Sequence, residues 1–439
     1  MPLKTDVVSR RSFQVHEHQL SNGLKALFVE NPAIPTISIN ASVLTGARYD
    51  PEEKAGLALM VSRLLDEGTK NRSSLEIAEA IESVGGAIET DGSFERIVVS
   101  ISILKKDLDL GLDLLSDLLI NPIFPQDYVE KEKERTLSEI ASAKDRPQVL
   151  AGWAFNELIY KDHPLHRPSH GYPETVEKLT RDDLLDFHKR YFVPNNAIVS
   201  IVGDFDIAEL LPKVEQVFAG WQSRPIAFPV YPAASRQTEP RNKIINMHAQ
   251  QLNIYLGHLG VVRSNPDYYS LQVLDTILGG GAGFTARIPQ KLRDELGLAY
   301  TTFASITMTA GLDPGRFVAF IGTSPENMNL AIDGLIQEIR RIVEQPVTES
   351  ELQDAKEYLT GSFVFAFETS GQIARFLVHA QVYGLGFDYI DKYPEYINRV
   401  TIEDIARVAR KYLDPQNYTL VVVGPVNQDE SIPNAITKN

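Results

Sequence analysis

The sequence contains an internal repeat, and this repeat restricts the folds that are open to the chain. Residues 179–204, LTRDDLLDFHKRYFVPNNAIVSIVGD, align without a gap on residues 400–425, VTIEDIARVARKYLDPQNYTLVVVGP. In both copies a helical pattern leads through a proline turn into an apolar strand. A second, looser match joins residues 121–133 to residues 345–357. Two copies are too few for a solenoid, so the pattern predicts one duplicated α+β domain.

A proline-rich segment separates the two copies. It covers residues 222–243, shows little hydrophobic periodicity and contains Pro225, Pro229, Pro232 and Pro240. This composition is typical of a semi-rigid linker. We therefore predict an N-terminal domain at 1–221 and a C-terminal domain at 244–439. Because strand patterns occur in groups between helices, each domain should be a mostly antiparallel or mixed sheet covered by helices on one face.

Local signals place many of the elements. A hairpin is predicted at Ser21-Asn22-Gly23. A helix should begin at Asp50-Pro51, with Glu53 closing a capping box, and end before Gly68. Other helices are expected near 74–83, 106–119, 126–144, 147–160, 266–278, 325–343, 349–367 and 402–412. Other strands are expected near 35–46, 96–104, 243–250, 252–260, 300–308 and 316–324.

Composition excludes several classes of function. The 58 acidic and 43 basic residues give a net charge of −15, which argues against nucleic acid or an anionic membrane as the main partner. The chain has no cysteine, so disulfides, thiolate metal sites and a thiol nucleophile are excluded. No apolar run is long enough to cross a bilayer and no signal peptide is visible, so the expected location is the cytoplasm.

A glycine-rich loop near the middle of the second copy is the best candidate for contact with a substrate. Gly279, Gly280 and Gly281 can adopt positive φ and allow another backbone to approach closely. Neither a P-loop lysine nor a complete GxGxxG pattern follows these glycines. The loop therefore lacks both phosphate-binding fingerprints, and a nucleotide site is not expected there.

A helix and a strand should follow this loop and carry two polar side chains. The helix signals are Thr285 as N-cap, Pro289 in the first turn and Gly297 just past the end. Arg293 lies on the predicted helix, and Tyr300 opens the predicted strand, where it should be partly buried. From these residues alone, an ordinary helix–turn–strand unit is the alternative to a substrate site.

Histidines suggest two further possibilities. His163, His166 and His170 occur in HPLHRPSH, but the intervening prolines prevent a regular helix, so only a metal site in a loop remains as an alternative. His16 and His18 share one face of the first strand, and no third ligand is evident nearby.

Six segments in order along the chain resemble the pitrilysin/insulinase-type zinc peptidases, and they are most similar to the processing-peptidase-like bacterial branch. These segments are QLSNGLKALFV, GLALMVSRLLDEGT, KERTLSEIASAKDRP, HPLHRPSHGYPETVEKLT, VPNNAIVSIVGDF and LGGGAGFTARIPQKLRDELGLAY. The resemblance implies two homologous α+β halves that face each other across the linker. It also implies that the chain forms a clam-like half of a chamber built from two such chains.

One motif of that family is missing. Its enzymes carry the zinc motif HxxEH on a helix of the first half. The matching positions here are Leu59, Met60, Val61, Ser62 and Arg63, while Glu139 matches the third ligand. A catalytic zinc needs about three protein ligands. The resemblance therefore implies that this chain holds no metal and does not hydrolyse peptides by itself.

A second feature of the family is retained. Arg293 and Tyr300 match an arginine and a tyrosine that contact substrate from the second half, beside the glycine loop. The resemblance implies a non-catalytic subunit of a heterodimeric peptidase, whose homologous partner carries HxxEH and zinc and acts on peptides. Two alternatives stay open: a structural or assembly core protein, and a chamber that binds peptides without cutting them.

Overall fold

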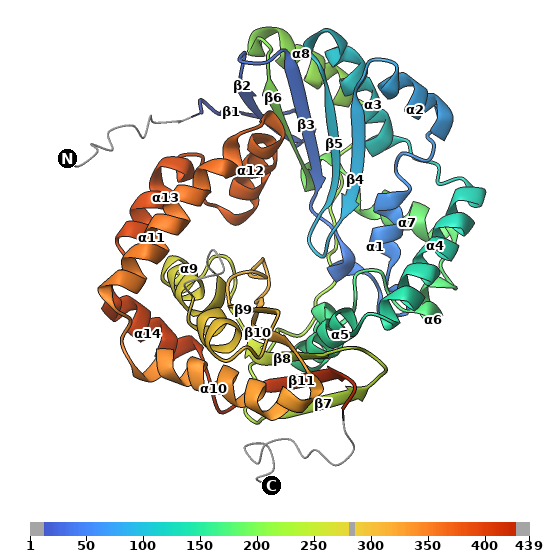
Figure 1. Ribbon diagram of the computed structural model, residues 1–439. Helices are drawn as coiled ribbons and strands as arrows, with labels where there is room; N and C mark the ends of the chain where they lie inside the picture. Colours follow the sequence, from blue (N-terminus) through green and yellow to red (C-terminus); the bar gives the residue numbers. More distant parts are fainter. Residues whose placement is uncertain (1–12, 281–285, 427–439) are drawn as a thin grey trace, which may run out of the picture.

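The strands form two separate sheets, one in each copy of the repeat (Figure 1). The computed structural model describes residues 13–280 and 286–426. The first sheet has the order β1-β2-β6-β3-β5-β4, with β1 His16–Gln19, β2 Lys25–Glu30, β3 Thr36–Val43, β4 Ala87–Gly92, β5 Ile97–Leu104 and β6 Ala197–Gly203. The second has the order β7-β11-β8-β10-β9, with β7 Arg241–Asn246, β8 Leu252–Leu259, β9 Thr301–Ser305, β10 Arg316–Thr323 and β11 Thr419–Gly424.

Both sheets are mixed, as predicted. One neighbouring pair in each is parallel, β2 with β6 and β7 with β11, and the other pairs are antiparallel. The aligned repeat segments end in β6 and β11, which occupy inner positions of the two sheets. Both strands are buried along their whole length, which explains why their sequences are continuous apolar runs and do not alternate.

Each sheet carries helices of its own copy on one face. In the first copy these are α1 Leu57–Arg63, α2 Ser74–Glu82, α3 Leu108–Ile120, α7 Arg181–Tyr191 and α8 Ile207–Phe218, which share one apolar core. In the second copy they are α9 Tyr268–Asp275, α10 Met328–Glu344, α11 Glu349–Phe363, α13 Tyr389–Asn398 and α14 Ile402–Tyr412. The long helix α4 Gln126–Lys144 and the short α6 Pro173–Val176 complete the first copy. In the described part of the chain, no helix is both long and apolar enough to cross a membrane.

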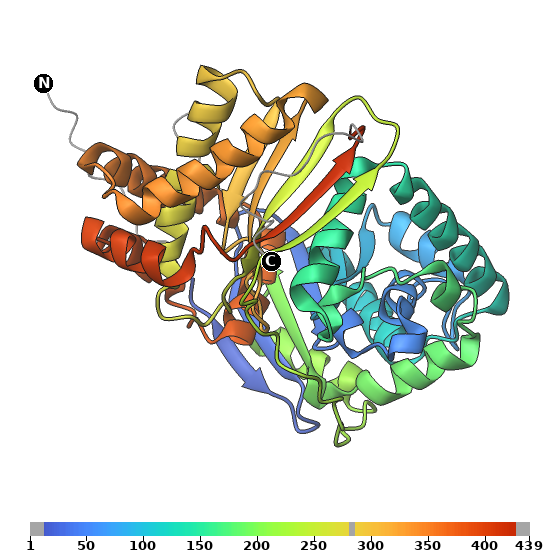
Figure 2. The same ribbon diagram turned by 90° about the horizontal axis from the view of Figure 1, so that it is seen from below.

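The opposite face of each sheet is covered by a helix from the other copy. Helix α5, Pro147–Tyr160, lies on β8 and β11 of the second sheet, where Phe155 packs against Tyr255. Helix α12, Ser370–Tyr383, lies on β3 and β6 of the first sheet, where Leu377 is buried. Figure 2 shows the second sheet between its own helices and α5. The two halves thus exchange one helix each.

The start of the first predicted helix is wrong. A 3₁₀ turn covers Glu52–Lys54, and α1 begins only at Leu57 and ends at Arg63. Gly56 has φ of 102°, a left-handed conformation that interrupts the helix before Leu57. The carboxylate of Asp50 accepts hydrogen bonds from the backbone N–H groups of Gly56 and Ala58, so this residue caps α1 from a distance along the chain.

Other differences from the predicted elements are additions or changes of helix type. Strand β4 and helices α8, α12 and α13 were not predicted. The region after the glycine loop is a π-helix, η7, over Pro289–Glu295, and Gly297 follows it with φ of 63° as predicted. The predicted helix 266–278 continues from α9 into a second π-helix, η6, Thr276–Gly280. Thr285 and Gly281 lie outside the described residues.

Candidate functional site

The positions that match the zinc motif lie on α1 and are occupied by groups that do not bind zinc. Ser62 is fully buried, and its hydroxyl donates to the backbone oxygen of Leu59 at 2.7 Å. A Cβ atom added to Gly92 of β4 would lie 2.5 Å from the Ser62 hydroxyl oxygen, so the helix packs tightly on the edge of the sheet. A glutamate in place of Ser62 would have little room there.

A guanidinium group fills the centre of this region. Arg63 Nη1 lies 2.9 Å from Glu132 Oε1 and 2.9 Å from Glu139 Oε2, both on α4. The second oxygens of the two glutamates pair with Arg135 at 3.2 and 3.4 Å. Both carboxylates are therefore already neutralised by cations of the same chain. The ion pair of Glu132 was not predicted from the sequence.

The two glutamates keep the Arg63 side chain positively charged. Burial lowers its pKa, but the hydrogen bonds to Glu132 and Glu139 outweigh burial, so the pKa lies above its ordinary value. A permanent cation between the two carboxylates repels Zn²⁺ from that position. The residues at this site therefore do not fit a zinc ion.

The histidine-rich loop does not supply a replacement site. His163 Nδ1 accepts from the backbone N–H of Leu165, and His166 Nδ1 lies 2.9 Å from the backbone oxygen of His163. The His170 ring is tilted against the Trp153 ring, with 4.7 Å between the ring centres. Burial lowers the pKa of His170, which keeps this imidazole neutral. Within residues 13–280 and 286–426, no three His, Asp or Glu side chains are grouped so that they could hold a metal ion. His18 pairs with Glu215 at 3.1 Å.

The second set of predicted site residues lies in the other half. Arg293, on η7, bonds Asp294 through Nε at 2.8 Å and is only partly exposed. Tyr300 immediately precedes β9 and is 89% exposed, so its predicted partial burial is wrong. Its hydroxyl has no hydrogen-bond partner among the described residues. This phenol is therefore available to a molecule outside the chain.

The glycines of the loop pack against β9. A Cβ atom on Gly279 would lie 2.4 Å from the backbone nitrogen of Ala304, so the close approach requires glycine at this position. Gly280 is less restricted, with a Cβ distance of 3.2 Å to the backbone oxygen of Asp275. Gly279 thus has a structural reason to be glycine that is independent of any substrate.

A polar cluster joins the two halves beside the degenerate motif. Asp313, in the loop between β9 and β10, pairs with Arg48 at 2.8 Å and with His163 at 3.5 Å. Tyr231 of the linker accepts from Arg48 and lies 3.5 Å from Asp313. Nothing in the sequence indicated this cluster, because its members come from four separate segments.

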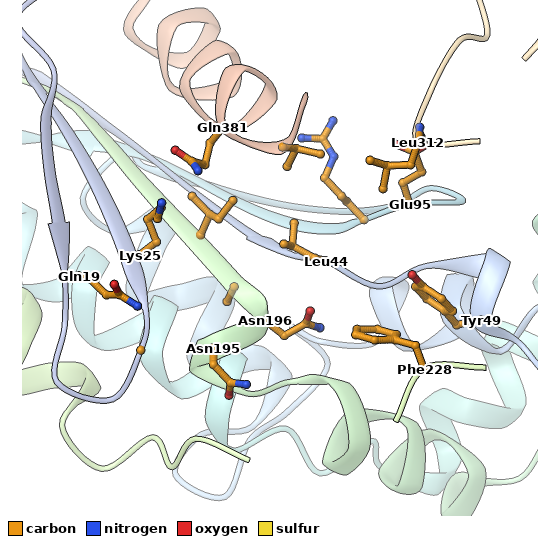
Figure 3. Close-up of a pocket in the computed structure, with 15 residues that line it drawn as sticks. Gln19, Lys25, Leu44, Tyr49, Glu95, Asn195, Asn196, Phe228, Leu312 and Gln381 are labelled. Atoms are coloured by element: carbon orange, nitrogen blue, oxygen red, sulfur yellow. Dashed lines mark hydrogen bonds between the residues drawn. The ribbon is translucent and has the colours of Figure 1, made fainter. Parts of the chain in front are cut away.

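The same loop borders a pocket of about 470 Å³ between the halves (Figure 3). Lys25 lines it from β2, Asn195 from the 3₁₀ turn before β6, Gln381 from α12, Phe228 from the linker, and Leu312 from the loop. None of the residues predicted from the sequence to form a site lines this pocket.

Comparison with known proteins matches two consecutive parts of the chain to one family. Residues 25–171 match the family described as insulinase (peptidase family M16), and residues 178–359 match the one described as the peptidase M16 inactive domain. The chain belongs to the insulinase family of peptidases, M16. The resemblance inferred from the sequence is thereby confirmed. The match described as the inactive domain begins within the first half and extends across the linker into the second.

Relatives of the M16 family align along nearly the whole chain. An uncharacterized zinc protease of Mycobacterium leprae is 28% identical over 98% of this chain and 96% of its own length. One of Streptomyces coelicolor is 27% identical over 95% and 91%. A crystal structure titled peptidase M16 inactive domain, from Pseudomonas fluorescens, has a TM-score of 0.88 at 24% identity over 95% of this chain and 100% of its own. A Helicobacter pylori protease has a TM-score of 0.85 at 22% identity over 93% and 99%.

The absence of zinc ligands in this M16 chain leads to a direct prediction. The isolated chain should retain no stoichiometric zinc after dialysis, because Arg63 occupies the cation position. A variant with Leu59→His and Arg63→His should bind zinc, since it frees Glu139 Oε2 from Arg63 and provides three ligands on adjoining helices. Elemental analysis of the parent, this double variant and Leu59→His alone tests both statements. Tightly held zinc in the parent would contradict our assignment of the site.

Proposed function

We propose that this protein is the non-catalytic subunit of a two-chain M16 zinc peptidase. It supplies Arg293 and Tyr300 to a homologous partner that carries HxxEH and zinc, and the pair acts on peptides or unfolded segments. The observation that carries the proposal is the contrast between the two sites. The former zinc position is filled by Arg63, whereas the Tyr300 hydroxyl is exposed and has no partner among the described residues.

The chemistry of the retained pair supports this role. A guanidinium and a phenol both donate hydrogen bonds, and neither can act as a hydrolytic nucleophile on its own here. Donors aimed at a peptide carbonyl stabilise the negative charge that develops on its oxygen during attack by zinc-bound water. Such donors are useful only where a second site provides the metal and the water. A partner chain with an intact HxxEH would provide both.

A purely structural role would not require an exposed phenol at this place. Tyr300 contributes little to the core because 89% of its surface is accessible. A scaffold protein could replace it without loss, which is why the effect of Tyr300 on turnover separates the two possibilities. A chamber that only binds peptides would predict a change in peptide affinity and no turnover in any mixture.

Assembly with a partner is the first test. Mixed with an HxxEH-bearing homologue from the same cell, the chain is expected to form a one-to-one complex that buries at least about 1,000 Å². Sedimentation velocity of each chain and of the mixture measures the stoichiometry of the complex. Peptide hydrolysis should appear only in the fraction that contains both chains, or be much greater there. Two separate species at micromolar concentration would count against the proposal.

A further inference from the structure

Arg263 is a buried cation that has no counter-ion in the described part of the chain. It lies between β8 and α9, and only 6% of its surface is exposed. Among the described residues, no carboxylate lies within ion-pair distance of its guanidinium group. Buried charges in proteins are normally paired, because an isolated charge loses its hydration without compensation. The position of Arg263 therefore requires an explanation.

Aromatic rings hold this guanidinium in place but do not neutralise it. Its Cζ atom lies 3.8 Å from the centre of the Tyr268 ring, and Nη2 donates to the Tyr389 hydroxyl at 2.9 Å. The ring of Tyr269 lies further away, at 5.9 Å. The Nε and Nη1 atoms have no hydrogen-bond partner in the described chain, and neither belongs to the fully buried polar atoms without partners. These donors are oriented by the cradle and still reach solvent.

A second arginine, from the other half, lies at the same loop. The backbone N–H of Arg263 donates to the Gly311 oxygen at 2.8 Å, and Glu95, which directly precedes Arg96, accepts from the backbone N–H of Leu312 at 2.7 Å. Arg96 lies in the turn between β4 and β5, and its side chain makes no ion pair with a described residue. Arg96 and Arg263 both act electrostatically on His379 and Tyr383 of α12. Burial lowers the pKa of His379 to about 4, and the two arginines add to that effect. Positive charge from both halves thus converges next to α12.

The nearest carboxylates are already occupied. Glu95 accepts hydrogen bonds from the Tyr383 hydroxyl at 2.5 Å and from the backbone N–H of Leu312 at 2.7 Å. Asp275 accepts four hydrogen bonds from residues 305–307 at the end of β9. Neither carboxylate forms an ion pair with Arg263 or Arg96 among the described residues, so the guanidinium donors of both arginines remain open to an anion from outside the chain.

We propose that Arg263, in its tyrosine cradle and assisted by Arg96, binds an oxyanion, either a carboxylate or a phosphate group. The planar fork of arginine matches the two oxygens of such a group and can bind both at once. The tyrosine cradle already fixes the guanidinium, so little side-chain freedom is lost on binding. The site shares no residue with the Arg293 and Tyr300 pair, and the proposal does not depend on the proposed peptidase role.

Calorimetric titration of the full chain, paired with thermal melting, tests this site. The probes are inorganic phosphate, succinate, and one pentapeptide with either a free or an amidated C-terminus, all at matched ionic strength. We expect one-to-one binding of phosphate or of the carboxylates, together with a rise in melting temperature. Preference for the free over the amidated peptide would identify a peptide C-terminus as the source of the carboxylate.

Three variants decide whether the binding belongs to this site. Arg263→Met should weaken it about tenfold or more, because a charge-assisted pair is lost. Arg96→Gln should weaken anion binding less. Because this variant leaves Arg263 and its tyrosine cradle in place, it tests the site if Arg263→Met does not fold. Arg399→Gln, which changes an exposed arginine paired with Glu395, should have no effect. Absence of binding by all probes, or equal binding by the parent and both site variants, would overturn the proposal.

Discussion

Replacing Tyr300 with phenylalanine is expected to slow peptide hydrolysis by the assembled pair about 10²- to 10³-fold, the usual effect of removing one donor from an oxyanion site. The substitution deletes only the hydroxyl group. Because 89% of the Tyr300 surface is exposed and its hydroxyl has no partner among the described residues, folding of this chain should be unaffected. The loss should appear in kcat, since the interaction strengthens as charge develops on the substrate oxygen.

The measurement is steady-state peptide hydrolysis by complexes shown to be one-to-one. Tyr358→Phe is a matched control, because it removes a hydroxyl group from another exposed tyrosine, on α11, that has no hydrogen-bond partner within residues 13–280 and 286–426. Arg293→Lys should also be poorly tolerated, since it keeps the charge but loses the planar fork. Full turnover by the assembled Tyr300→Phe complex would remove the pair from the mechanism and favour a scaffold role.

Substitution of Asp313 with alanine is expected to reduce the free energy of unfolding by about 3–5 kcal/mol, the cost of leaving a buried charge without its partner. Arg48 is 8% exposed, and its Nη1 atom is already buried without a partner in the described chain. Loss of the Asp313 carboxylate would leave this guanidinium with the Tyr231 hydroxyl as its main remaining contact. Urea unfolding of the parent and the variant measures the difference.

The contribution of Asp313 to the free energy of unfolding should decrease as the pH is lowered. Burial raises its pKa, but the hydrogen bond from His163 and the charge of Arg48 outweigh burial and hold the pKa below its ordinary value. The stabilisation is therefore fully present above the pKa of the unfolded aspartate, which is near 4, and it is lost as pH falls through the folded pKa. Asp313→Asn should flatten this part of the profile.

An exposed ion pair serves as the control for the Asp313 substitution. Asp388→Asn breaks an exposed pair with Lys392 in the second half, which should change the free energy of unfolding by less than about 1 kcal/mol. If Asp313→Ala is no more destabilising than this control, the loop between β9 and β10 is not held by its ion pairs.

The sequence predicted the parts of the fold that depend on local pattern. The repeat and the apolar runs of β6 and β11 were sufficient to predict two mixed sheets, since strands covered on both faces need no alternation. The start of α1 was not predictable in the same way. Asp50 resembles an ordinary N-cap, but its carboxylate reaches past a 3₁₀ turn to Gly56 and Ala58. Only the folded loop brings these groups together.

The sequence showed which residues occupy the zinc-ligand positions, but it did not show which contacts those residues make. Arg63 stood out as a cation at a ligand position, and Glu139 as an isolated carboxylate. Their ion pair, and the second one with Glu132, depends on the packing of α4 beside α1. The same holds for Arg263, whose missing counter-ion can be recognised only when its neighbours are known.

The exchange of α5 and α12 changes what the linker does for the molecule. A segment that merely tethers two independent domains is essential to their association, because cutting it turns an intramolecular contact into a dilute bimolecular one. Here a helix of each half covers one face of the other half's sheet. If the linker were cleaved, the two fragments would therefore remain associated through α5 and α12. If the halves moved apart as rigid bodies, Phe155 of α5 or Leu377 of α12 would lose its contacts with the sheet of the other half. In the proposed two-chain peptidase, admission of a peptide would therefore depend on movement between the chains and not on a hinge within this one.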